Sequence, residues 1–170
     1  LALLERDGLA RQAGVRRLGD ARKPSVLYEL PGDAEPLLSR AYPPVLTALV
    51  ASVVDTLPRR RANAMLRDVG RRLARGTGGE ATGTLEQRVS AAAAILTSLG
   101  GDVEVTQDEG ALYIRGSGCP LSATVSHHPA LCRTVEALLT EVVGAPTRQA
   151  CEHGTRPRCR FVIETVDSAA

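Results

Sequence analysis

The stretch that decides the fold class is residues 84–117, TLEQRVSAAAAILTSLGGDVEVTQDEGALYIRGS. It opens with Thr84 followed three residues later by Gln87, a capping box that predicts the start of a helix. Apolar residues then recur at helical spacing as far as the Gly100-Gly101 stop. After the stop the pattern alternates with a period of two, which predicts two strands joined by a turn at 108–110. Their expected inward residues are Val103, Val105, Leu112 and Ile114.

The residues that follow this stretch predict a second helix and a second pair of strands. The helix is expected from about Pro129 to Val143, with Gly144 and Pro146 ending it. Strands are expected over 147–151 and 159–166. The order helix–strand–strand–helix–strand–strand over 84–166 indicates an open α+β sandwich.

Two helices are predicted upstream of the sandwich. Residues 42–57 carry apolar side chains at spacings of three and four, and Pro58 separates them from a second periodic stretch, 59–75. The expected apolar face of the second helix is Ala62, Met65, Leu66, Val69 and Leu73, and its other face is rich in arginine. The glycine-rich segment 76–83 that follows is the best candidate for a domain boundary.

The N-terminal segment predicts a basic hairpin. After a helix end at residues 1–8, strands are expected over 9–17 and 25–30, with a turn-rich basic loop between them. Residues 1–75 carry 14 Lys and Arg against 8 Asp and Glu, whereas residues 76–170 carry 7 against 11. The basic half is therefore the one suited to a polyanion, although an ordinary hairpin with a solvated loop has the same pattern. Its basic residues are Arg11, Arg16, Arg17, Arg22 and Lys23.

Composition narrows the class of protein. A content of 44% hydrophobic residues with 24% charged residues indicates a globular chain. No run of 18 apolar residues and no signal-peptide pattern is present, so a cytoplasmic protein outside the membrane is expected. The sequence has no Ser–His–Asp arrangement, phosphate-binding loop, HExxH or GxGxxG motif, and we expect no enzymatic activity.

The cysteines are the chemically informative residues. All four fall in the last third of the chain, at Cys119, Cys132, Cys151 and Cys159, separated by 12, 18 and 7 residues. Four cysteines, which are soft ligands, lie in one segment of the chain, and in a cytoplasmic protein their thiols would stay reduced. They therefore suggest a metal or iron–sulfur site. Structural zinc generally uses cysteine pairs two to four residues apart, and none is present, so the spacing favours an iron–sulfur cluster over zinc. Cys132 is expected near a helix N-terminus, which would stabilise a thiolate.

Other interpretations of the cysteines stay open. They could be small buried hydrophobic residues, two disulfides of an exported protein, or a metal-free thiol switch in which Cys151 pairs with Cys159. His127, His128 or His153 could replace one cysteine as a ligand. Glu136, one helical turn after Cys132, could bond a neighbour of the site or remain solvated.

Two groups of motifs resemble a known family. Residues 3–10 (LLERDGLA) and 21–30 (ARKPSVLYEL) resemble the recognition-helix end and wing of ArsR/DeoR-like winged-helix regulators. Residues 118–121 (GCPL), 128–132 (HPALC), 136–139 (EALL) and 159–161 (CRF) resemble the C-terminal domain of SufR-type iron–sulfur transcriptional regulators. Together the motifs span nearly the whole chain.

The resemblance implies a fold, a cofactor and a partner. It implies an α+β protein in which residues 1–30 are a truncated N-terminal winged helix without its earlier helices, 31–76 are a linker and dimerisation helices, and 84–166 are a cysteine-containing sensor domain. In such regulators three cysteines hold the cluster, which corresponds here to Cys119, Cys132 and Cys159. Cys151 has no counterpart in the family pattern, and its role as fourth ligand is inferred from its expected proximity.

The resemblance therefore implies a homodimeric transcription factor that binds double-stranded operator DNA, and the basic residues of the hairpin that we expect to contact it are Arg11, Arg16, Arg17, Arg22 and Lys23. A redox-sensitive cluster, 4Fe–4S rather than 2Fe–2S, would be held by Cys119, Cys132, Cys151 and Cys159 and would control DNA binding. The alternatives are a zinc-binding regulator and a metal-free thiol switch. A small-molecule-binding or catalytic domain fused to a regulator ranks last, because the sequence offers no catalytic pair.

Overall fold

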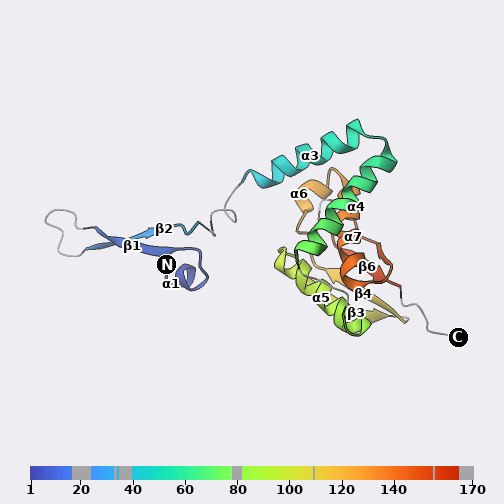
Figure 1. The fold of residues 1–170 in the computed structure, drawn as a ribbon. Coiled ribbons are helices and arrows are strands. Elements are labelled where there is room, and N and C mark those ends of the chain that lie inside the picture. Colours follow the sequence, from blue (N-terminus) through green and yellow to red (C-terminus); the bar gives the residue numbers. More distant parts are fainter. Residues whose placement is uncertain are drawn as a thin grey trace. The chain divides into compact units, whose positions relative to one another are not determined.

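The computed structural model describes residues 1–16, 24–32, 34, 40–77, 82–108, 110–154 and 156–164. The chain divides into two compact units, Leu1–Tyr42 and Pro43–Ala170. Within the described ranges it is a mixed α+β protein with six α-helices, one 3-10 turn and two antiparallel sheets of two and four strands (Figure 1).

The first unit contains a short helix and a hairpin. These elements are α1 (Ala2–Arg6), β1 (Arg11–Arg16) and β2 (Ser25–Glu29), and the two strands pair antiparallel, as the sequence predicted. A register shift between Gln12 and Gly14 marks a bulge, and Gly14 has a φ of 144°, which favours glycine. Every β1 residue is exposed.

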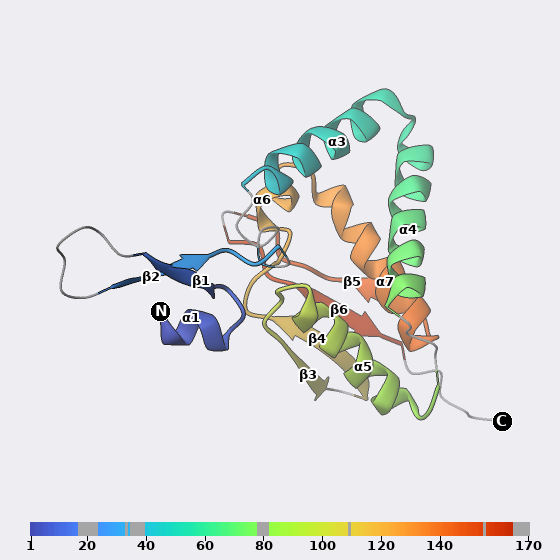
Figure 2. The ribbon, with the colours of Figure 1, turned by 60° about the vertical axis from the view of Figure 1, so that its left-hand side comes forward.

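The second unit is a four-stranded sheet with helices packed on it (Figure 2). The strand order is β3-β4-β6-β5, and all pairs are antiparallel. Its elements are α3 (Tyr42–Thr56), α4 (Arg59–Gly76), α5 (Leu85–Ser98), β3 (Val103–Asp108), β4 (Ala111–Gly116), α6 (Ser122–Val125), the 3-10 turn η1 (Pro129–Leu131), α7 (Cys132–Val143), β5 (Thr147–Gln149) and β6 (Arg160–Ile163).

Local sequence signals account for most of these boundaries. Thr84 and Gln87 form the predicted capping box at the start of α5. Gly144 adopts a left-handed φ of 63° and ends α7. Leu112 and Ile114 are buried, which confirms the predicted inward face of β4, and Phe161 and Ile163 are the corresponding buried residues of β6.

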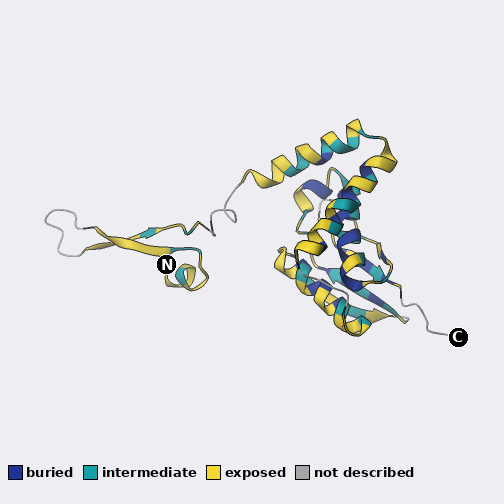
Figure 3. Cartoon of the chain, viewed as in Figure 1, coloured by how far each residue is buried: buried dark blue, intermediate teal, exposed yellow. Residues whose placement is uncertain are grey.

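Two apolar predictions were wrong. Val105 lies on the edge strand β3 and is 39% exposed, because an edge strand has a neighbour on one side only. Helix α4 buries a face made of Ala62, Leu66, Gly70 and Ala74 instead of the wider predicted stripe. The remaining residues of that stripe, Met65, Val69 and Leu73, are exposed. Helix α4 accordingly carries both buried and exposed residues along its length (Figure 3).

The buried face of α4 crosses α7 at close range. A Cβ added to Gly70 would lie 2.9 Å from the Ala137 Cβ and closer still to the Thr134 carbonyl oxygen. The Thr134 hydroxyl donates a hydrogen bond to the Leu66 carbonyl at 3.0 Å. Glycine at position 70 therefore lets the two backbones approach, and the hydroxyl bond fixes their register.

Candidate metal centre

The four cysteines come from four different places in the second unit. Cys119 lies in the turn after β4, Cys132 is the first residue of α7, and Cys151 and Cys159 flank the loop between β5 and β6. That loop is closed by an isolated antiparallel bridge between Glu152 and Arg158, as expected for two thiols at one end of the sheet.

The structure brings all four thiols together. The Cys159 thiol lies near enough to those of Cys119 and Cys151, and the Cys132 thiol near enough to that of Cys151, for each to shift the pKa of its neighbour. The thiols thus form a connected row in the order Cys119, Cys159, Cys151, Cys132. Cys151, whose inclusion the sequence supported least, has two thiol neighbours and lies inside the row.

The row lies where two hydrophobic clusters meet. The first, here called the sheet core, contains Cys159 with buried residues of α5, α7, β4 and β6 and Ala74 of α4. The second, the helix core, contains Cys132 with Val50, Leu66, Val125 and Leu131. Cys119 and Cys151 pack against both cores. The thiols therefore join the sheet to helices α3 and α4.

The thiol contacts separate the acidities of the four cysteines. Hydrogen bonding from Cys159 lowers the pKa of Cys119 to about 7. Donation from Cys132 and then Cys159 lowers the pKa of Cys151 to about 3. The pKa values of the two donors, Cys132 and Cys159, are raised by these hydrogen bonds and by burial. Two thiols thus ionise readily and two retain their protons.

The prediction that Cys132 would be stabilised as a thiolate was wrong. Its position at the start of α7 is as predicted, but the bond to Cys151, burial and the neighbouring charges of Cys151, Cys119 and Glu136 raise its pKa.

Main-chain groups help to ionise Cys151. The Arg160 N–H donates to the Cys151 Sγ at 3.4 Å, and the Arg160 carbonyl lies 3.5 Å from the same sulfur. His153 also lowers the pKa of Cys151 through its charge. Arg160 belongs to β6, and the spacing of the cysteines in the sequence could not reveal that its N–H reaches Cys151.

Glu136 bonds a neighbour of the site and is not simply solvated. Its Oε2 accepts a hydrogen bond from the Gln149 N–H at 3.1 Å, and its Oε1 lies 3.6 Å from the Arg133 guanidinium. The carboxylate ties α7 to β5 two residues before Cys151. Of the three histidines, His127 and His153 are exposed and His128 is half-buried.

The space between the thiols is small and apolar. A cavity of about 10 Å³ is lined by Cys119, Cys132 and Cys159 with seven other residues, among them Val125 and Phe161. Within the described ranges, no group of three or more His, Cys, Asp or Glu side chains is placed so that it could hold a metal ion. The thiols are thus neighbours, but their side chains would have to rotate toward a common centre to become ligands.

The donor set nevertheless suits a soft metal group. Four sulfurs, two of them acidic, meet in a largely apolar region between the two cores. Thiolates are the ligands of iron–sulfur clusters and of structural zinc. The residues therefore fit such a group in their chemistry.

The predicted DNA-binding residues are only partly described. Arg11 and Arg16 are exposed on β1, and Arg11 Nε forms an ion pair with Glu29 at 2.6 Å. That pair competes with any phosphate for Arg11, whereas Arg16 forms no ion pair with the residues that the structure describes. Arg17, Arg22 and Lys23 lie outside the described residues.

No protein-family model matches the chain, and no curated protein matches it.

In the part of the chain that the structure describes, no helix is both long and apolar enough to cross a membrane.

Proposed function

We propose that this chain is a DNA-binding transcriptional regulator whose second unit holds a redox-sensitive iron–sulfur cluster through Cys119, Cys132, Cys151 and Cys159. The observation that carries the proposal is the convergence of four thiols from four separate elements at the junction of the sheet core and the helix core. When bound, such a cluster would supply an oxygen-sensitive covalent link among these elements.

The thiols are connected to the helices that precede them in the sequence. Thr47 of α3 and Thr124 of α6 share a hydrogen bond of 2.9 Å between their hydroxyls. Val50 of α3 and Leu66 of α4 pack in the helix core with Cys132. A shift of the segment between Cys119 and Cys132 would therefore move α3 and α4, which lie between the thiols and the basic hairpin in the sequence.

The same helices offer a surface for a second copy of the chain. Exposed apolar side chains follow one stripe of α3 and one stripe of α4. We propose that these stripes pack in a homodimer, so that movements of α3 and α4 would alter the separation of two basic hairpins. The stripes are Tyr42, Val45 and Leu49, and Met65, Val69 and Leu73.

The hairpin is the proposed DNA contact. The exposed Arg16 would bind phosphate or the minor groove, which gives affinity without reading bases in the major groove. Arg17, Arg22 and Lys23 are part of the same proposal on sequence grounds.

A zinc-binding regulator is the second candidate, and one observation favours it. The cavity of about 10 Å³ beside Cys119, Cys132 and Cys159 is too small for a multi-iron cluster without movement of the surrounding side chains, and a single ion requires less space. Four thiolates around one ion is also an ordinary structural zinc site.

Direct measurement of DNA affinity tests the regulator. Duplexes would be selected from a random pool with anaerobically purified protein, and the Kd would then be measured at fixed salt before and after exposure to air. We expect the Kd to change by about tenfold or more, a coupling of ordinary allosteric size. Equal affinity in both states would contradict redox control, and failure to select any sequence would contradict a DNA-binding function.

A further inference from the structure

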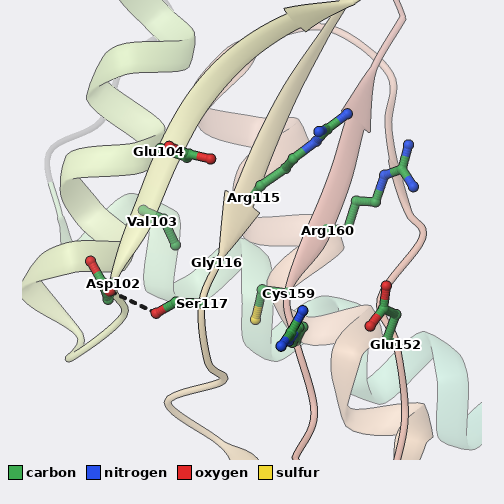
Figure 4. A pocket seen from close by; sticks show the side chains of 10 residues that line it. Asp102, Val103, Glu104, Arg115, Gly116, Ser117, Glu152, Cys159 and Arg160 are labelled. Carbon is green, nitrogen blue, oxygen red and sulfur yellow. Dashed lines mark hydrogen bonds between the residues drawn. The ribbon is translucent and has the colours of Figure 1, made fainter.

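The outer face of the sheet, opposite the helices, carries a second candidate site. A pocket of about 520 Å³ lies over β3, β4 and β6 (Figure 4). Its volume is in the range of small-molecule sites. Its charged lining consists of three arginines and three acids, namely Arg115, Arg158, Arg160, Asp102, Glu104 and Glu152.

The arginines are arranged as pre-ordered donors. The guanidinium carbons of Arg115 and Arg160 lie 4.9 and 5.2 Å from the centre of the Tyr113 ring, and cation–π contact orders both side chains. Arg115 Nε is buried and has no hydrogen-bond partner among the residues described. Its guanidinium makes one long ion pair, 3.7 Å to Asp108. Within the described ranges, Arg158 and Arg160 make none.

The acids lie beside the arginines without neutralising them. Figure 4 shows Glu104 and Asp102 on the β3 side and Glu152 on the opposite side, with Arg115 and Arg160 between them. Asp102 accepts a hydrogen bond from the Ser117 hydroxyl at 2.6 Å. Across the part of the chain that the structure describes, neither Glu104 nor Glu152 forms an ion pair. Charges of both signs thus face one pocket and are separated within it.

We infer that this pocket binds a small zwitterion, an amino acid or short peptide. Its carboxylate would accept hydrogen bonds from the guanidinium N–H groups of the arginines that line the pocket, of which Arg115 and Arg160 are ordered on Tyr113. Its ammonium group would lie against Glu104 or Glu152. A simple anion would leave the flanking carboxylates unpaired, and a simple cation would leave the arginines unpaired, so both bind more weakly.

The pocket shares strand β6 with the thiol row but does not depend on a metal there. The Arg160 side chain lies in the pocket, while its main-chain N–H donates to the Cys151 Sγ at 3.4 Å. Cys159 also lines the pocket. The inference therefore stands or falls separately from the proposed regulator.

Calorimetric titration of the full chain tests the inference. The probes are L-glutamate and triglycine as zwitterions, succinate as an anion and putrescine as a cation. We expect saturable binding of a zwitterion at least about tenfold tighter than either single-sign probe, since each lost charge-assisted bond has about that effect. No saturable binding of a zwitterion, or equal binding of succinate, would overturn the inference.

Single substitutions test whether the zwitterion binds in this pocket. Arg160→Gln should weaken zwitterion binding by about tenfold, and Arg148→Gln, an exposed arginine on β5 outside the pocket, should not change it. Glu104→Gln should lower zwitterion affinity while leaving or raising succinate affinity, a reversal that misfolding cannot produce. Equal affinities in wild type, Arg160→Gln and Glu104→Gln would place the ligand elsewhere and refute the assignment.

Discussion

Replacing Cys159 with alanine removes the thiol that most strongly lowers the pKa of Cys119. At pH 7, a thiol with a pKa of about 7 is about half ionised, whereas a thiol at the ordinary value of 9.0 is about one per cent ionised. A lower pKa also makes the thiolate less nucleophilic, by about six- to tenfold over that interval. The net advantage of Cys119 is therefore about five- to eightfold in alkylation rate.

The assay is timed iodoacetamide labelling of reduced, metal-free protein, with Cys119 followed by peptide mass spectrometry. In wild type the labelling rate should rise with pH around a midpoint near 7, because only the thiolate reacts. In Cys159→Ala the midpoint should move toward 9.0 and the rate at pH 7 should fall by about five- to eightfold.

Cys159→Ser is the matched control, because its hydroxyl keeps a hydrogen-bond donor and it leaves a smaller cavity. It should retain most of the Cys119 reactivity. If Cys119 in wild type reacts like an ordinary thiol, or if Cys159→Ala leaves its rate unchanged, the deduced row of thiols is wrong.

Three further predictions concern other parts of the molecule. Cys132→Ala should abolish any redox response of DNA binding, and a wild-type response in a band-shift assay would remove Cys132 from the sensor. Gly70→Ala should lower the free energy of unfolding in urea by about 1–3 kcal/mol, because its Cβ would collide with α7. Gly76→Ala has open space for its Cβ and should not lower the free energy of unfolding. Equal effects of the two substitutions would contradict the close crossing of α4 and α7. Arg16→Ala should weaken DNA binding and reduce its salt dependence more than Arg11→Ala, whose side chain pairs with Glu29; the reverse order in salt titrations would argue against the assigned contacts.

Periodicity predicted the sandwich well because its signals are local. The capping box at Thr84 and the alternation of Leu112 and Ile114 each depend on a few neighbouring residues. The buried face of α4 was harder, because it depends on α7. Gly70 contributes little to a hydrophobic pattern, but its missing side chain is what lets the two helices cross closely.

The cysteine site, too, could be predicted only in part from the sequence. The spacing in the sequence identified the four cysteines as candidate ligands, but it could not show that Cys151 lies between Cys132 and Cys159. That placement requires the bridge between Glu152 and Arg158, which folds the loop back. The acidity of Cys132 could not be predicted either, since it depends on three-dimensional neighbours and not on its helix position.

The central claim is that the four thiols together hold an iron–sulfur cluster. Iron and acid-labile sulfide would be measured on anaerobically purified protein, with zinc determined in the same sample. The account predicts brown protein absorbing near ~400 nm, with iron and sulfide in equal amounts approaching about four of each per chain. Colourless protein with one zinc per chain and no sulfide would contradict it.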